Sequence, residues 1–295
     1  MRTTFVALAA IAFGGVSSLS ASTIFGLTTG NQLVVFDSAS PGTVSSTYTI
    51  SGLNSGQTLV GIDFRPSTGG LVGLGYNSAT GAGQIYSLSS MGQATAVGGV
   101  FALNGSQFGF DFNPVPDALR IISETEQNLR ITMGGAGTVN TDTALTRTPG
   151  SPDPGLRTIG AAYTNNFPGG IGGVTTLFVI DAASGNLYTQ GGANGSPSPN
   201  LGQLFLIGSL GLGTNLSNRI GFDILGANAA FASVNNNLYS VNLNTGAASL
   251  IGAVGGSGDL ADIAVAPVPE PASLGLIGVT LAGLAYMRRR RSQQR

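Results

Sequence analysis

The stretch that decides the fold is a short segment of glycine and aspartate that recurs along the chain. It reads Gly-Ile-Asp-Phe at residues 61–64, Gly-Phe-Asp-Phe at 109–112 and Gly-Phe-Asp-Ile at 221–224. Weaker copies are Gly-Ala-Ala-Tyr at 160–163 and Leu-Ala-Asp-Ile at 260–263. The copies lie roughly 40 to 60 residues apart, which is the period of a repeat architecture. The pattern therefore predicts one structural unit that the chain uses several times.

Short apolar and β-branched runs, separated by Gly, Asn, Ser, Asp and Pro, follow each of the first four copies. This alternation of runs and turn residues is typical of strands, and no segment has sustained helical periodicity. After residue 61 the predicted strands are 71–76, 84–88 and 94–98, and after residue 221 they are 229–234, 237–243 and 247–251. Four strands per repeat indicate the blade of a β-propeller.

The two ends of the repeat region predict how the ring closes. Residues 23–27, 32–36 and 46–50 form three strands without a first one, and residues 260–265 form a first strand alone. Pairing of that last strand with the first three completes a fifth blade and hides an open sheet edge. We therefore predict an all-β, five-bladed β-propeller over residues 23–267, with a β-sandwich or a β-solenoid as the alternative.

The composition excludes most familiar enzyme chemistry. Only 8% of the residues are charged, against roughly 25% in an average globular domain. The chain has no Cys, His or Lys, so it lacks thiolate nucleophiles, Ser-His catalysis, imidazole ligands and the lysine of a phosphate-binding loop. Between residues 23 and 267 twelve acidic residues stand against six arginines. Because nucleic acid needs a basic surface, it is not an expected partner.

Residues 1–22 have the order of a secretory signal peptide. Arg2 supplies the positive charge, residues 5–15 are apolar, and residues 16–22 are small. We expect a signal helix that is removed by cleavage between Ser20 and Ser22. The alternative is a buried N-terminal helix.

The most specific signal lies in residues 268–295. An apolar stretch over 272–287 stands between two motifs: Val268, Pro269, Glu270 and Pro271 before it, and Arg288, Arg289, Arg290 and Arg291 after it. The stretch is shorter than the roughly 20 residues of a comfortable membrane span, but it can form a transmembrane helix if Tyr286 and the arginine side chains lie at the membrane interface. This tail resembles the PEP-CTERM sorting signal. The alternative is a plain single-span anchor.

The resemblance implies export in a Gram-negative bacterium through a precursor anchored in the inner membrane. It also implies recognition of the tail, and cleavage near Pro-Glu-Pro, by an exosortase-type membrane enzyme. The expected final location is the cell surface or the extracellular matrix, with exopolysaccharide or other envelope and biofilm components as partners.

The region between the two ends resembles a bacterial family catalogued as a domain of unknown function. The resemblance is carried, in order, by Gly-Phe-Asp-Phe-Asn-Pro at 109–114, Gln-Asn-Leu-Arg at 127–130, Ala-Ala-Tyr-Thr-Asn-Asn at 161–166 and residues 221–224. It implies no functional residue, because the family has no established activity.

The repeated aspartates are the main candidates for chemistry. Asp63, Asp111, Asp223 and Asp262 take one repeat position in this alignment, with Ala162 in the fourth copy. If the repeated strand is innermost, the carboxylates meet near the central channel, where such a ring would favour Ca²⁺. The preferred interpretation is structural: each Asp accepts backbone N–H bonds within or between blades. We therefore assign no metal and no cofactor.

The alternative function is a carboxylate-based glycosidase or another carbohydrate-active enzyme, because glycoside hydrolysis needs only two carboxyl groups. The domain has two glutamates, Glu124 and Glu126, both beside a predicted turn, and the chain has no Trp to stack on a sugar. Arg65, Arg120 and Arg130 are candidate partners of these acids, in weak surface pairs or as a ligand clamp. We predict a non-catalytic structural or binding module with no catalytic residue.

Three further expectations concern packing and loops. The phenylalanines of the repeated strands are expected to pack between blades: Phe64, Phe110, Phe112 and Phe222. Asn104, Asn194 and Asn215 match the glycosylation sequon but are interpreted as turn residues. The segment 134–157, with Pro149, Pro152 and Pro154, is expected to be an irregular surface loop.

Overall fold

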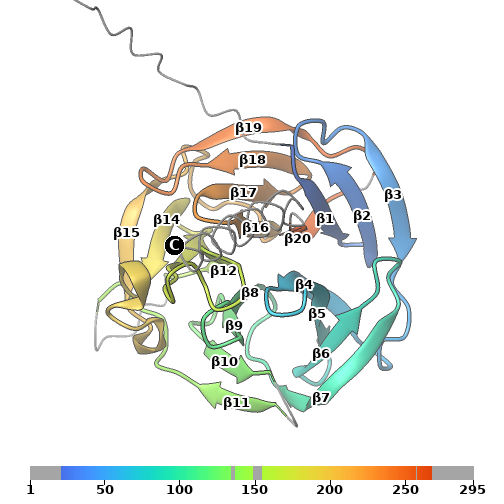
Figure 1. Ribbon diagram of the computed structural model, residues 1–295, viewed down its shortest axis with the longest axis horizontal. Helices are drawn as coiled ribbons and strands as arrows, with labels where there is room; N and C mark the ends of the chain where they lie inside the picture. Colours follow the sequence, from blue (N-terminus) through green and yellow to red (C-terminus); the bar gives the residue numbers. More distant parts are fainter. Residues whose placement is uncertain (1–20, 134–136, 149–154, 257, 268–295) are drawn as a thin grey trace, which may run out of the picture.

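Five four-stranded antiparallel sheets surround a central axis in the computed structural model, which describes residues 21–133, 137–148, 155–256 and 258–267 (Figure 1). Each sheet is one blade of a propeller, and the strand nearest the axis is the one that carries a copy of the repeat. This arrangement confirms the predicted all-β, five-bladed propeller and excludes the sandwich and the solenoid.

The blades follow one another along the chain. Blade 1 contains β20 (Leu260–Val265), β1 (Thr23–Thr28), β2 (Gln32–Asp37) and β3 (Val44–Thr49). Blade 2 contains β4 (Thr58–Arg65), β5 (Gly70–Asn77), β6 (Ala82–Leu88) and β7 (Ala94–Ala102). Blade 3 contains β8 (Phe108–Asn113), β9 (Ala118–Ser123), β10 (Asn128–Thr132) and β11 (Thr138–Thr141).

Blade 4 contains β12 (Thr158–Tyr163), β13 (Leu177–Asp181), β14 (Asn186–Gln190) and β15 (Leu204–Ser209). Two short 3₁₀ helices, η1 (Ala193–Gly195) and η2 (Pro199–Leu201), connect its last two strands. Blade 5 contains β16 (Ile220–Leu225), β17 (Ala229–Val234), β18 (Asn237–Val241) and β19 (Ala248–Ala253).

The ring is closed by pairing of the last strand with the first. β20 runs antiparallel to β1, with Ile24 opposite Val265 and Gly26 opposite Ile263. The open edge of β1 is thereby covered by the most distant strand of the domain, as the sequence predicts.

The apolar core is divided among the five interfaces between blades. Each of the five buried clusters joins two neighbouring blades, so both faces of the inner strands are covered. Phe110, Phe112 and Phe222 are buried in these clusters, as expected, whereas Phe64 is only half-buried and packs edge-on against Phe25 with ring centroids 5.3 Å apart. Burial on both faces explains why the residues around the repeated glycine and aspartate of the inner strands are mostly apolar and do not alternate with polar ones.

The expectation that residues 134–157 form an irregular surface loop is wrong for residues 138–141 and for two buried leucines, whereas residues 142–148 and 155–157 lie outside any strand, as expected. Residues 138–141 are β11, the outer strand of blade 3. Leu145 and Leu156 are buried in the cluster between blades 3 and 4. The error has a physical reason: β11 reads Thr-Val-Asn-Thr, and an exposed edge strand with one apolar residue gives almost no alternating pattern. Pro149, Pro152 and Pro154 lie outside the described residues.

The two predicted ends of the chain lie almost wholly outside the described residues. These are the signal segment up to residue 20, and the tail with Val268, Pro269, Glu270, Pro271 and the arginines 288–291. Among the residues that the structure describes, no helix has the length and hydrophobicity needed to cross a membrane.

Candidate functional site

Glycine and aspartate of the repeat have separate tasks at the axis. The glycine lies two residues before the aspartate position, at 61, 109, 160 and 221. A Cβ on Gly221 would lie 2.5 Å from the backbone nitrogen of Ile263 in β20, and one on Gly61 would lie 2.7 Å from Cβ of Phe110 in β8. The glycine therefore lets neighbouring inner strands approach one another closely.

The aspartates link each inner strand to the next by hydrogen bonds. Oδ2 of Asp63 accepts from the amide of Phe112 (2.8 Å), and Oδ1 of Asp111 accepts from the amide of Tyr163 (3.0 Å). Oδ2 of Asp223 accepts from the amide of Val265 (2.5 Å). These bonds agree with the structural interpretation of the repeated aspartates, in which each carboxylate fixes the backbone of the neighbouring blade.

Asp262 does not occupy the repeat position to which the sequence alignment assigns it. In the other blades the bonded amide belongs to the residue after the aspartate position, and in β20 it belongs to Val265. Ala264 therefore takes the aspartate position, and Asp262 lies two residues earlier, where the other strands have glycine. Because residues two apart share one face of a strand, the Asp262 carboxylate lies on the same face of β20 as a side chain at the aspartate position would. Its Oδ2 accepts from the amide of Ile62 (2.9 Å).

Three of the carboxylates form a buried cluster. Oxygen atoms of Asp63, Asp111 and Asp223 all lie within 4.8 Å of one another, and the three residues are 2–5% exposed. Asp262 lies close enough to act electrostatically on Asp63 and Asp111. Within the described ranges no arginine forms an ion pair with any of the four. A small cluster of carboxylates has oxygens that could bind a cation such as Ca²⁺, which is the alternative to the structural interpretation of these residues.

Burial determines the protonation of this cluster. Desolvation is the largest cause that raises the pKa of Asp63, Asp111 and Asp262 well above the usual value, and repulsion between neighbouring carboxylates adds to it. Desolvation also raises the pKa of Asp223, to about 6, against the opposing effect of its two backbone hydrogen bonds. The raised pKa values therefore favour the protonated form of these carboxyl groups where they meet.

We expect the free energy of unfolding to fall as the pH rises from 5 to 8. A carboxyl group with a raised folded-state pKa holds its proton more strongly in the folded state, so its contribution is full at low pH and is lost as the pH rises through about 6. Urea midpoints measured between pH 5 and 8 test this.

The matched variant for the pH test is Asp111→Asn, which keeps an oxygen for the amide of Tyr163 but does not titrate. Its midpoint should depend less on pH than that of the wild type. Asp117 titrates below this range, because its hydrogen bonds with Arg65 lower its pKa. Midpoints that rise with pH would contradict the assignment.

A funnel of about 370 Å³ opens at the axis, where the inner strands begin. Its lining includes Thr58 of β4, Phe108 of β8 and Ile220 of β16. Most of its polar groups are neutral, and Arg219, paired with Asp259, is its one charged residue among the described part of the chain. The four carboxylates are not among its lining residues, so the funnel and the acidic cluster are separate features.

The arginines and glutamates singled out from the sequence do not pair as expected. Arg65 pairs with Asp117, and Arg120 and Arg130 pair with Asp142. The Glu124 carboxylate accepts from the amides of Ser106 and Gln107 and from the Ser106 hydroxyl, which places it in a turn. The sequon residues Asn194 and Asn215 have positive φ and Gly105 follows Asn104 with φ 117°, in agreement with turns.

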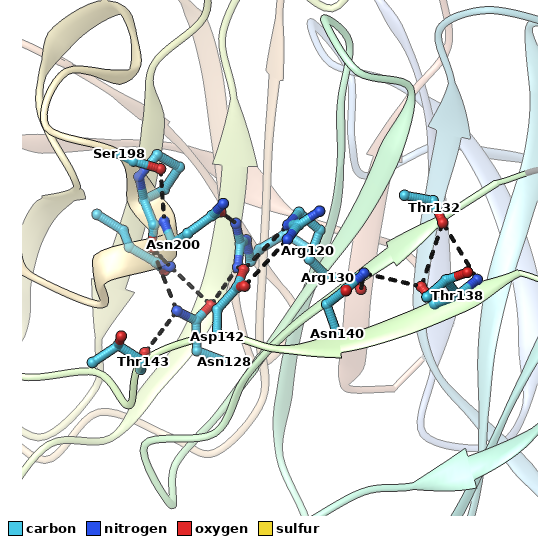
Figure 2. A network of polar contacts seen from close by, with 12 residues as sticks. Arg120, Asn128, Arg130, Thr132, Thr138, Asn140, Asp142, Thr143, Ser198 and Asn200 are labelled. Carbon is cyan, nitrogen blue, oxygen red and sulfur yellow. Dashed lines mark hydrogen bonds and ion pairs between the residues drawn. The ribbon is translucent and has the colours of Figure 1, made fainter.

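Arg120 is the centre of a buried polar network that sequence reasoning missed (Figure 2). Its Nη1 donates to Asn128 (2.6 Å) and Asp142 (2.7 Å), and its Nη2 donates to Asn200 of η2 (2.6 Å). The network joins blade 3 to blade 4. Arg120 and Asn200 are 80 residues apart in the sequence, so no local pattern could have indicated the contact.

The geometry thus defines a five-bladed propeller whose inner strands pack closely at the repeated glycines and are linked by hydrogen bonds of the repeated aspartates. The family described as "Domain of unknown function (DUF4394)" matches residues 32–264, and the chain belongs to that family. The PEP-CTERM protein-sorting motif matches residues 267–291, which agrees with the sequence-based resemblance of the tail. The protein is therefore exported and sorted by an exosortase-type system.

Comparison with other proteins adds weak structural similarities. No curated protein matches the sequence. A crystal structure of a nidogen/laminin complex has a TM-score of 0.45 at 12% identity, covering 84% of this chain and 98% of the other. A putative 6-phosphogluconolactonase from Bacteroides uniformis has a TM-score of 0.42 at 12% identity (81% and 84% covered). A protein from Lactobacillus plantarum has 0.38 at 15% identity (82% and 71% covered).

Proposed function

We propose that the protein is a non-catalytic module, displayed at the cell surface or in the extracellular matrix, that binds or builds envelope material such as exopolysaccharide. The observation that carries the proposal is the way in which the buried aspartates at the axis are hydrogen-bonded. Asp63, Asp223 and Asp262 each accept amide hydrogens with both oxygens, one from their own strand and one from the next blade. These groups hold the blades together.

The same observation argues against the glycosidase alternative. Glycoside hydrolysis needs two carboxyl groups that reach the substrate from either side of the scissile bond. The clustered aspartates are at most 5% exposed, and the Glu124 carboxylate is engaged by Ser106 and Gln107. No pair among them is both free and accessible. This favours a role in binding or assembly.

We expect the full-length protein to release no sugar from a panel of aryl glycosides and polysaccharides. The panel is run with wild type and with Asp111→Asn, whose folding is checked by its melting temperature. Hydrolysis by the wild type that disappears in a well-folded Asp111→Asn variant would overturn the proposal in favour of a carboxylate-based enzyme.

A further inference from the structure

A second depression lies between blades 4 and 5, away from the acidic cluster. Its volume is about 420 Å³, within the range of small-ligand pockets. Its polar lining consists of Thr164, Thr176 and five asparagines (Asn165, Asn194, Asn228, Asn242 and Asn244). The described residues that line it carry no charge. The chemistry of this pocket therefore suits a neutral, hydrogen-bonding ligand.

The loops that form the pocket are fixed before any ligand arrives. The amide of Asn165 donates to the carbonyl of Gly226 (2.6 Å), and the amide of Gly226 donates to Oδ1 of Asn166 (2.7 Å). The amide of Asn194 donates to Oγ1 of Thr176 (2.8 Å). Since these bonds join the β12–β13 loop to the β16–β17 turn and to η1, binding would not have to order the loops.

Three amide side chains of the pocket are free to bind a ligand. Asn194, Asn228 and Asn244 are exposed, and within the described chain their side chains form no hydrogen bond. Each side-chain amide offers two donors and an acceptor. A row of hydroxyl groups, each both donor and acceptor, complements such a set.

An exposed aromatic ring lies next to the β16–β17 turn, which contributes to the pocket. Phe167 is 38% exposed. Its ring lies beside Gly226, since a Cβ on that glycine would be 3.8 Å from Cε2 of Phe167, and the next residue, Ala227, lines the pocket. An apolar ring face next to neutral amides matches a sugar, which has C–H groups on one face and hydroxyls at its edge.

We propose that the pocket between blades 4 and 5 binds a neutral carbohydrate, with Asn194, Asn228 and Asn244 contacting its hydroxyls and Phe167 covering its apolar face. The assignment rests on the proposed role as a binding module, and names its site and ligand class. The pocket follows the ends of β12 and β16, so it opens on the face where β20 ends and the chain continues to the sorting motif.

The test uses full-length protein on an array of neutral gluco-, galacto- and manno-oligosaccharides beside oligosaccharides that contain uronic acid. The strongest neutral ligand is then titrated by calorimetry. Asn228→Ala with Asn244→Ala, and separately Phe167→Ala, should each weaken binding roughly tenfold or more. Asn54→Ala, an exposed asparagine remote from the pocket, is the matched control and should bind like wild type. Melting temperatures establish that each variant is folded.

The outcomes test the assignment of the pocket separately from the proposed non-catalytic function. Loss of neutral binding in the pocket variants alone supports the assignment. Equal binding by wild type and pocket variants, binding only to acidic oligosaccharides, or no binding to any sugar would overturn it. None of these results depends on the hydrolysis panel, so the non-catalytic proposal stands or falls separately.

Discussion

Arg120→Ala should lower the free energy of unfolding by about 3–5 kcal/mol, because removing one member of a buried ion pair leaves the other uncompensated. The Arg120 side chain is 1% exposed, and its guanidinium holds Asp142, Asn128 and Asn200 together. Arg130 cannot replace it, since it reaches Asp142 only at 3.3 Å from a more exposed position. Urea unfolding, with the midpoint and slope compared with wild type, measures the loss.

The matched control for Arg120 is Arg65→Ala. Arg65 also pairs with an aspartate, Asp117, but the two side chains are 23% and 30% exposed. Surface pairs of this kind contribute about 0–1 kcal/mol. Equal losses for the two variants would show that the Arg120 network does not hold blades 3 and 4 together.

Gly221→Ala is expected to lower the free energy of unfolding by about 3 kcal/mol, at the upper end of the usual cost of overpacking. The new Cβ would lie 2.5 Å from the nitrogen of Ile263 and 2.7 Å from the carbonyl carbon of Asp262. Both are backbone atoms of the closing strand, so no side chain can turn aside to make room. Thermal and urea unfolding both report the change.

Two other glycines calibrate this effect. Gly160→Ala should cost less, because its nearest neighbour is Cβ of Phe222 at 3.2 Å. Gly99→Ala, on the outer strand β7 with nothing within 4 Å, should change the free energy by no more than about 0.5 kcal/mol. A Gly99 variant as unstable as the Gly221 variant would contradict the assignment of close packing to the axis.

The inner strands could be predicted from the sequence because each of them has to pack closely against its neighbours at the axis. Close approach at the axis requires glycine, and the carboxylate two residues later accepts the amide of the next blade. Close packing and the hydrogen bond to the next blade therefore require glycine and aspartate two residues apart, as in Gly61 with Asp63 and Gly109 with Asp111. The number of blades and the closing pair of strands follow from counting these copies.

The register of β20 could not be predicted in the same way. An aspartate occurs near the expected place, but it occupies the glycine position, and Ala264 takes the aspartate position. Both arrangements bring a carboxylate to the same face of the strand, so residue type alone cannot distinguish them. Only the backbone amide that each carboxylate contacts decides the register.

Contacts between distant loops were beyond sequence reasoning for another reason. The partners of Arg120 come from a strand, a loop and a 3₁₀ helix, and the asparagines that lie between blades 4 and 5 come from separate connections. In the sequence each asparagine reads as an ordinary turn residue, because Asn tolerates the backbone conformations of turns. What brings them together is the circular order of the blades.

The pairing of β20 with β1 also decides when this domain can fold. Ile24 and Val265 lie opposite one another, at the two ends of the domain. Until the ribosome has made the last of these strands, β1 keeps an open edge and the gap between β16 and β4 is unfilled. Contacts between residues so far apart in the chain form slowly. The complete ring of blades can therefore close only after the ribosome has synthesised residues 260–265, however early the separate blades form.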